Sequence, residues 1–96
     1  PLLAPDSGVF VVTPICPHVL TNRSVIVNDR SCITVRPSAG QLGVCLTMDG
    51  RLPLALEPGD VTQIRRSRQV LRLVFPEGLP FFEVLRQKLK WSGKVV

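Results

Sequence analysis

The side chains best suited to covalent chemistry lie close together near the amino-terminal end of the chain. Cys16 and His18 flank Pro17, and residues two apart in an extended chain face roughly the same way. A thiol beside an imidazole can begin a nucleophilic site, but no third group that would orient His18 is evident. We therefore expect Cys16 to be a core residue and His18 to be a hydrogen-bonded loop or interface residue.

Groups that bind phosphate or metal ions are scarce. The sequence contains neither the P-loop nor the dinucleotide-binding pattern, so no glycine-rich loop would cradle a phosphate. Asp49 and Asp60 each belong to a turn sequence, where shaping the turn is the simpler role. The only histidine is His18, and three cysteines follow no metal-ligand spacing: Cys16, Cys32 and Cys45. We expect no catalytic group, no metal site, and cysteines that stay reduced in a cytosolic protein.

Basic residues outnumber acidic ones, with 12 Lys and Arg against 7 Asp and Glu and a formal charge of +5. Such a balance favours an anionic partner: a nucleotide, a nucleic acid or an acidic protein surface. Four arginines gather around one connection between strands: Arg65, Arg66, Arg68 and Arg72. Single-strand binders interleave such charge with aromatic side chains, whereas most aromatic residues here lie in the tail. A solvated basic face is the favoured interpretation, and a stand-alone basic β module that binds nucleic acid or a protein stays open as the alternative.

The elements that would position these side chains are short strands. A chain of 96 residues allows one small domain with a thin core. Turn-forming Pro, Gly, Asn and Asp recur about every ten residues and predict strands between them. Asp49-Gly50 predicts a tight turn that makes 44–56 a β-hairpin, and Pro58-Gly59-Asp60 predicts another turn. The expected strands are 9–13, 24–27, 32–36, 44–48, 52–56, 61–66 and 70–75.

The tail changes from a strand-like to a helical period. Phe82, Leu85 and Leu89 recur at i, i+3 and i+7, which predicts an amphipathic helix of about three turns with Pro80 in its first turn. We expect a mainly β fold, in which an antiparallel two-layer β domain (sandwich-like) over 1–78 is followed by one carboxy-terminal α-helix and tail over 79–96. The apolar stripe of that helix needs a surface to cover.

The first residues of the chain and its hydropathy are informative about processing and about contact with a membrane. It starts at Pro1 without an initiator Met, so we expect either a processed chain or a piece of a longer protein. No basic segment precedes an apolar run of signal-peptide length, and no stretch approaches the ~20 apolar residues that a membrane span needs. We expect a soluble protein.

One segment of the sequence resembles a motif of a known protein family. Residues 13–23 read Thr-Pro-Ile-Cys-Pro-His-Val-Leu-Thr-Asn-Arg, which resembles the Thr-Pro-Ile-Cys-Pro-His-Ser-Leu-Ser-x-Arg-Pro stretch of NAD kinases. Three later segments resemble that family in order and spacing: the strand ending in Asp-Gly at 46–51, the Gly-Asp strand at 57–66 and the closing aromatic helix at 81–91. The resemblance covers nearly the whole chain. A lipid or diacylglycerol kinase shares the general layout, but the string at 13–18 argues against it.

The chain departs from the family pattern at a few positions. Val19 stands where Ser is usual, and Ser24 stands where Pro is usual. Arg51 stands where Gln is common, and Lys90 stands where Gly is usual. These differences indicate a diverged bacterial-type member, and they bear on substrate detail more than on the family.

The resemblance implies an enzyme that phosphorylates the 2′-hydroxyl of the adenosine ribose of NAD to give NADP. The phosphate donor would be ATP or polyphosphate, with a divalent metal such as magnesium. The family's catalytic aspartate lies in a Gly-Gly-Asp-Gly motif of an amino-terminal α/β domain. Neither that motif nor the family's Asn-Glu pair and Thr-rich loop occurs here. The resemblance therefore implies a carboxy-terminal part that is inactive alone, binds no cofactor itself, and contributes contacts and assembly.

The resemblance also assigns roles to particular residues. Arg51 would contact NAD through its guanidinium, and Asp49 and Gly50 would shape the hairpin tip that carries it. The motif residues are given a scaffold or subunit-interface role: Thr13, Pro14, Pro17, His18 and Arg23. The expected partners are NAD, a missing amino-terminal kinase domain against which the tail helix would pack, and further copies in a dimer or tetramer. We expect a cytoplasmic location, no membrane contact and no nucleic acid.

Overall fold

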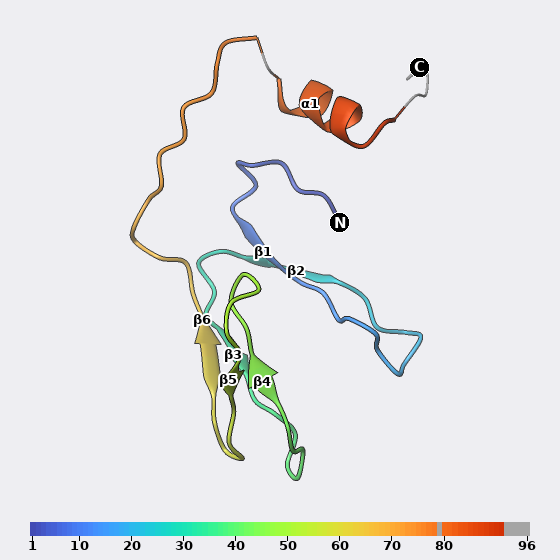
Figure 1. Ribbon diagram of the computed structural model, residues 1–96, viewed down its shortest axis with the longest axis vertical. Coiled ribbons are helices and arrows are strands. Elements are labelled where there is room, and N and C mark those ends of the chain that lie inside the picture. Colours follow the sequence, from blue (N-terminus) through green and yellow to red (C-terminus); the bar gives the residue numbers. More distant parts are fainter. Residues whose placement is uncertain (79, 92–96) are drawn as a thin grey trace. The chain divides into compact units, whose positions relative to one another are not determined.

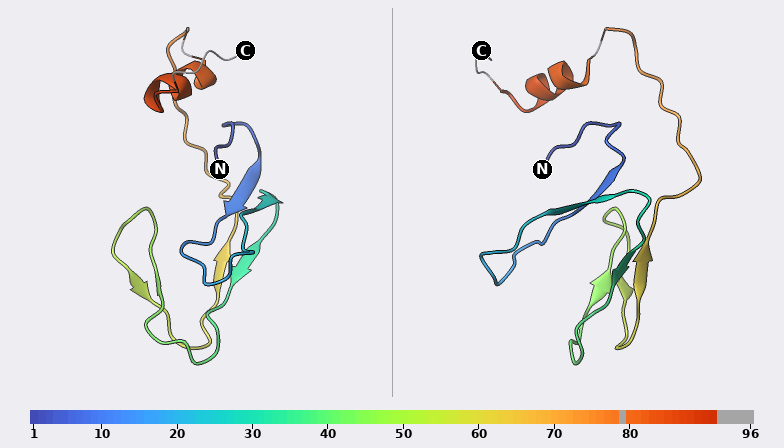
Figure 2. Two further views of the ribbon diagram at one scale, coloured as in Figure 1. Left: turned by 90° about the vertical axis from the view of Figure 1, so that its right-hand side faces the viewer. Right: turned by 180° about the vertical axis from the view of Figure 1, so that it is seen from behind.

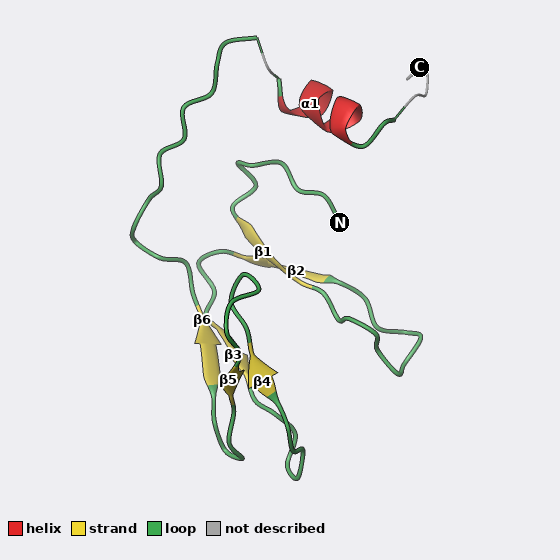
Figure 3. Cartoon of the chain, in the orientation of Figure 1, coloured by secondary structure: helices red, strands yellow, loops and turns green. Residues whose placement is uncertain are grey.

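The computed structural model describes residues 1–78 and 80–91, which hold short strands and one helix (Figures 1 and 3). The chain divides into two compact units, which are described separately. Gly8–Ser67 carries all the strands, and Pro1–Ser7 together with Arg68–Val96 carries the helix. In chain order the elements are β1 (Val9–Val12), β2 (Val25–Asn28), β3 (Ile33–Val35), β4 (Cys45–Leu46), β5 (Leu54–Ala55), β6 (Thr62–Ile64) and α1 (Phe81–Lys88).

β1 and β2 form an antiparallel pair because two β-branched runs face each other, with Val12 opposite Val25. The side chain of Asn28 ends β2. The side-chain Oδ1 of Asn28 accepts a hydrogen bond from the backbone N–H of Arg30 at 2.9 Å, and the backbone carbonyl of Asn28 accepts one from the N–H of Ser31 at 3.0 Å. An asparagine favours this kind of turn because its side chain imitates a backbone acceptor. At the other end of the pair, residues 13–24 connect the two strands.

The remaining strands form two nested antiparallel pairs, seen from two further sides in Figure 2. β3 pairs with β6, with Ile33 opposite Ile64, and the β4–β5 hairpin lies between them in sequence. The turn before β6 follows from local chemistry. Proline at its second position and Gly59 at its third, with φ +94°, meet the requirements of a type II turn. The N–H of Asp60 donates to the carbonyl of Glu57 at 3.0 Å and closes that turn.

The structure confirms the mainly β, antiparallel character and the single carboxy-terminal helix. It does not show the predicted two-layer sandwich, because in the described residues the strands form three separate two-stranded sheets. The strand predicted at 70–75 is wrong. That segment runs as an extended trace in Figure 1, and no neighbouring strand in the described ranges pairs with it. A β-prone sequence becomes a strand only when a partner supplies the ladder of hydrogen bonds.

The tail helix is shorter than predicted, with eight residues and not about three turns. Pro80 lies one position before α1, at the N-cap, and not in the first turn. Its carbonyl accepts hydrogen bonds from the N–H groups of Glu83 at 3.1 Å and Val84 at 3.2 Å. Leu79 and residues 92–96 of the predicted helix and tail lie outside the described residues. Within the described ranges, no helix has the length and apolar character to cross a membrane.

The carboxyl end of α1 closes with a residue in the left-handed region. Lys90 has φ +53°, its N–H donates to the carbonyl of Gln87 at 3.3 Å, and the N–H of Trp91 donates to the carbonyl of Arg86 at 3.0 Å. These two bonds are those of a Schellman motif, whose left-handed position usually holds glycine. Lysine occupies it here at a conformational cost.

The described residues contain no buried core. No residue in the described ranges is buried, and the best covered apolar side chains, such as Phe10, Ile33 and Leu56, are only half-buried. The three cysteines are free, and all are exposed. The expectation that Cys16 is a core residue is therefore wrong, because Cys16 lies in the connection between β1 and β2, where the described residues leave it exposed.

Candidate functional site

The residue predicted to contact the substrate lies at the tip of the β4–β5 hairpin. Asp49 and Gly50 both have positive φ, +51° and +68°, and the N–H of Arg51 donates to the carbonyl of Met48 at 3.0 Å. Two successive positive φ values define a type I′ turn, whose twist matches that of the strands. A Cβ on Gly50 would meet nothing within 4 Å, so the backbone conformation, and not crowding, favours glycine there.

The side chains of this tip are available for a ligand. Arg51 and Asp49 are exposed, and in the described part of the chain no hydrogen bond or ion pair uses the guanidinium of Arg51 or the carboxylate of Asp49. A guanidinium offers five N–H donors in a planar fork that suits phosphate oxygens. The tip can therefore present a cation to an anionic group without first breaking an internal contact.

The motif loop, which we define as residues 13–24, is tied at its base and within its second half. The hydroxyls of Thr13 and Ser24 lie 3.0 Å apart, next to the last residue pair of β1 and β2. Arg23 donates from Nη1 to the carbonyls of Leu20 and Asn22, at 3.0 Å each. The Arg23 guanidinium thus braces the loop from inside, since each bond closes a short stretch of backbone.

The other motif residues are exposed in the loop. Cys16 has φ +50°, between Pro14 and Pro17, and His18 follows at once. In the ranges that the structure covers, neither the thiol of Cys16 nor the imidazole of His18 makes a hydrogen bond. The two side chains therefore do not form a nucleophile–base pair. The interface role of Thr13, Pro14, Pro17, His18 and Arg23 stays a prediction.

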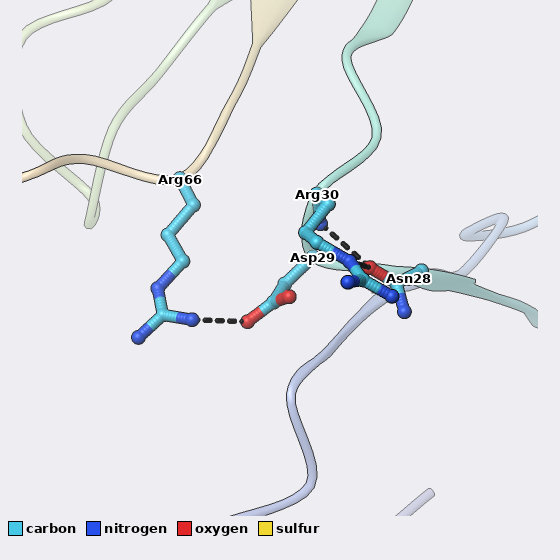
Figure 4. A network of polar contacts seen from close by, with 4 residues as sticks. All are labelled: Asn28, Asp29, Arg30 and Arg66. Carbon is cyan, nitrogen blue, oxygen red and sulfur yellow. Dashed lines mark hydrogen bonds and ion pairs between the residues drawn. The ribbon is translucent and has the colours of Figure 1, made fainter.

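Figure 4 shows a polar junction that the sequence did not predict. Arg66 follows β6, and its Nη1 lies 2.7 Å from Oδ2 of Asp29, which follows β2. The carboxylate side is well covered, with 16% of the Asp29 side chain exposed against 66% for Arg66. The N–H of Asp29 donates to the carbonyl of Gly8 at 3.1 Å. The junction therefore joins the end of the β1–β2 pair to the end of the β3–β6 pair.

The junction also changes the interpretation of the arginine cluster. Arg66 was predicted to belong to a solvated basic face, but it is engaged with a carboxylate. Arg66 and Asp29 are separated by 37 positions in the sequence, and neither has a neighbour in sequence that points to the other. The one signal in the sequence that could have predicted this ion pair is an Asp shortly after one expected strand and an Arg at the end of another.

A hollow of about 330 Å³ lies beside the two nested pairs. Its walls are mostly apolar, and its polar rim includes Arg36, Ser38 and Gln41. No convergent set of charged groups from the described residues faces it, so it fits a packing surface better than a ligand site. The apolar wall residues are Val35, Val44, Leu46, Leu56 and Ile64.

The predicted site residues do not form one cluster. Among the described residues, no hydrogen bond or ion pair links the tip at 49–51 with the motif loop. The same residues contain no group of three or more His, Cys, Asp or Glu that could hold a metal ion. The described residues thus offer an exposed tip that carries Arg51 and a braced loop, but no set of groups that could transfer phosphate.

Comparison with known proteins gives a consistent result. A family model described as "ATP-NAD kinase C-terminal domain" matches residues 1–75. Similar proteins named NAD kinase include those of Syntrophotalea carbinolica, 45% identical over 94 residues, and Geobacter metallireducens, 41% identical over 94 residues. The protein of that name from Chlorobium phaeobacteroides is 43% identical over 92 residues.

These alignments cover nearly all of this chain but only part of each relative. They cover 98%, 98% and 96% of this chain, but 33%, 33% and 32% of the three relatives. The chain therefore spans about a third of the length of the curated relatives that it matches. No solved structure matches it.

Proposed function

This chain belongs to the family of ATP-NAD kinase C-terminal domains, and from that premise we propose that it serves as the carboxy-terminal part of an enzyme that converts NAD to NADP. The reaction would phosphorylate the 2′-hydroxyl of the adenosine ribose, with ATP or polyphosphate as donor and a divalent metal such as magnesium. The observation that carries the proposal is the match over residues 1–75, together with relatives named NAD kinase that align over nearly the whole chain.

The chemistry of the phosphate transfer would belong to the rest of the enzyme. The described residues do not fit a magnesium site, because no three acidic, histidine or cysteine side chains come together. The sequence also has no glycine-rich loop for a triphosphate. We therefore expect this chain alone to form no NADP.

The contribution of this chain would be a contact with NAD. The guanidinium of Arg51 is exposed at a turn whose backbone conformation is fixed by Asp49 and Gly50. A fixed tip holds the cation in place before the substrate arrives, which lowers the entropy cost of the contact. The pyrophosphate of NAD is the natural partner, because it offers paired anionic oxygens to the planar fork of donors.

The tail helix would pack against the missing amino-terminal domain. An apolar hollow of about 400 Å³ is lined by Pro5, Phe75, Phe81 and Val84, all of which belong to the unit that carries α1. Such a surface is costly to leave in water and marks an interaction site. The proposal also includes assembly into a homo-oligomer and a cytoplasmic location.

The proposal can be tested in a hybrid protein. The matching third of the Syntrophotalea carbinolica NAD kinase would be replaced by this chain, and NADP formation would be followed with NAD, ATP and magnesium. We expect the hybrid to be active and the 96-residue chain alone to be inactive. An inactive hybrid that is folded, or turnover by the chain alone, would contradict the proposed division of labour.

The contact itself is tested by Arg51→Ala in the hybrid. A hydrogen-bonded charge contact that is equal in the ground and transition states should raise KM for NAD about tenfold and leave kcat nearly unchanged. Arg65→Ala is the matched control, because Arg65 is also exposed and has no side-chain contact within the described residues. Equal effects of the two substitutions on KM would count against a role for Arg51.

A further inference from the structure

The strand-bearing unit, Gly8–Ser67, consists of two parts. The first part is the β1–β2 pair, which carries the motif loop, and the second is the two nested pairs, which carry Arg51 beside the β4–β5 turn. Within the described residues, no strand of the first part contacts a strand of the second. Residues 29–32 form the connection from β2 to β3. Packing between strands therefore does not set the orientation of the motif loop relative to the tip.

The Asp29–Arg66 pair bridges the two parts at the start of that connection (Figure 4). Asp29 is held by the first part, because its N–H donates to the carbonyl of Gly8 at 3.1 Å. A Cβ on Gly8 would lie 3.7 Å from Oδ2 of Asp29, and Gly8 has φ +58°, so glycine suits this close approach to the carboxylate. Arg66 reaches the same oxygen from beyond β6, in the second part, at 2.7 Å. The two parts are thus joined by a charge-assisted hydrogen bond.

The carboxylate takes its partner from the second part and not from its neighbour in sequence. Arg30 follows Asp29 directly, but its Nε donates to Oδ1 of Asn28 at 3.1 Å. Arg65 precedes Arg66 and makes no side-chain contact within the described residues. Because the Asp29 side chain is only 16% exposed, its bond with Arg66 is a defined contact in a covered position.

We propose that Asp29 and Arg66 are positioning residues for NAD binding, which hold the Arg51 tip in one orientation relative to the motif loop. The inference rests on the proposed function and deepens it, because it adds what places the Arg51 guanidinium before NAD arrives. In the intact enzyme the chain would enter this unit at Gly8, so the location of the tip relative to that entry depends on the angle between the two parts. A binding group has to be held to within about 0.5 Å of its productive position, which a single flexible connection does not achieve.

The size of the effect follows from the exposure of the pair. Two-thirds of the Arg66 side chain is in water, and ion pairs of this kind shift an equilibrium by only about two- to fivefold. When one orientation binds the ligand, the apparent affinity falls with the population of that orientation. Loss of the pair should therefore raise KM for NAD by at most about fivefold, which is less than the roughly tenfold rise expected for loss of Arg51 itself.

The first experiment measures the orientation directly in the 96-residue chain, by double electron–electron resonance between two spin labels. One label is attached to Cys16, which is exposed in the motif loop. The other is attached at the tip after Met48→Cys, where the native side chain is 70% exposed. Cys32→Ser and Cys45→Ser remove the remaining thiols. We expect one dominant distance between the labels.

Loss of the ion pair should broaden that distribution of distances. We expect Arg66→Gln to broaden it, and Arg66→Lys, which keeps the charge, to leave it narrow. Arg65→Gln is the matched control and should change nothing. Addition of about 1 M sodium chloride should broaden the distribution while Arg66 is present and add nothing in Arg66→Gln, because salt screens exposed charges. An unchanged far-ultraviolet circular dichroism spectrum checks that each variant keeps its strands.

The second experiment tests in the hybrid protein whether the pair acts through Arg51. Arg66→Gln should raise KM for NAD about two- to fivefold and leave kcat nearly unchanged. In a hybrid that already carries Arg51→Ala, Arg66→Gln should change KM by less than about 1.5-fold, because the contact that it positions is gone. Arg65→Gln should leave KM unchanged in both backgrounds. A residue that only stabilises the fold would have the same effect with and without Arg51.

The outcomes separate this inference from the proposed function. An unchanged distance distribution in Arg66→Gln overturns the inference, and so does an equal rise in KM for NAD with and without Arg51→Ala. Both results leave the kinase proposal in place, since the unsubstituted hybrid is then active. A folded hybrid without activity overturns the kinase proposal and the role in NAD binding together. The distance measurement needs no activity, so it still decides whether the pair sets the orientation.

Discussion

The 96-residue chain alone should not unfold cooperatively, and the reason is the surface that it leaves in water. It exposes 9568 Å². A compact globular protein of 10.6 kDa would expose about 5,500 Å². Even two separate globules with the sizes of its two units would expose only about 6,500 Å². The excess surface of roughly 3,000 Å² is therefore more than separation of the two units alone accounts for.

The size of the expected effect follows from the same areas. The unfolded chain would expose about 15,400 Å², so this fold removes roughly 0.6 of the area that a compact fold would remove. An ordinary domain of this length has a heat capacity of unfolding of about 1.2–1.4 kcal/mol/K. We therefore expect no more than about 0.8 kcal/mol/K here. No described residue is buried, so the part of that change that comes from apolar side chains is smaller still.

The assay is differential scanning calorimetry of the chain at concentrations below those at which it self-associates. We expect a broad, shallow transition and binding of the hydrophobic dye ANS before heating. The hybrid with the Syntrophotalea carbinolica domain is the control, and it should absorb heat in a sharp transition because the missing domain covers the apolar surface. A single endotherm of about 65 kcal/mol from the monomeric chain, with equal calorimetric and van't Hoff enthalpies, would refute the reasoning.

Two further predictions concern stability and are best measured in the hybrid protein. A double-mutant cycle with Asp29→Asn and Arg66→Gln should give a coupling free energy of about 0.5–1 kcal/mol in urea unfolding. The coupling should fall as salt is added, because two-thirds of the Arg66 side chain is exposed. Strictly additive effects of the two substitutions would mean that the ion pair contributes nothing to stability. Lys90→Gly should raise the stability of the end of α1 by about 1 kcal/mol, because glycine takes a φ of +53° without strain. Leu89→Gly is its control, since Leu89 has a φ of −88° and glycine there should lower the helix signal at 222 nm.

The elements that sequence reasoning located correctly are those that local chemistry determines. Asp49-Gly50 produced a type I′ turn, and Pro58-Gly59 produced a type II turn, because the φ values these turns need are available to those residues at little cost. The six observed strands lie between such turns at nearly the predicted positions. The location of Arg51 at an exposed tip was predictable for the same reason, since it depends only on the turn beside it.

The features that sequence reasoning missed depend on residues far apart in the chain. Asp29 and Arg66 are 37 positions apart, and each taken singly fits a turn or a solvated surface. The predicted sandwich is not confirmed in the described residues; it requires the strands to stack face to face, and the order of turns contains no information on that stacking. The burial of Cys16 was inferred from residue type alone, whereas exposure depends on what covers the loop.

The wrong strand at 70–75 and the missing core have a common physical cause. Strand residues such as Ile26 and Val35 are about half exposed, although β-branched side chains in strands normally cover one another. A run like 70–75, in which Arg72 is the only polar residue, is typical of a strand that is covered on both sides. These apolar strand residues therefore require more burial than the described residues of this chain provide. The hollow beside α1, proposed above as the surface for the amino-terminal domain, is where part of that contact should be found. If the hybrid unfolds cooperatively and the chain alone does not, the apolar side chains of this sequence are indeed meant to be buried. The surface that buries them then lies outside this chain.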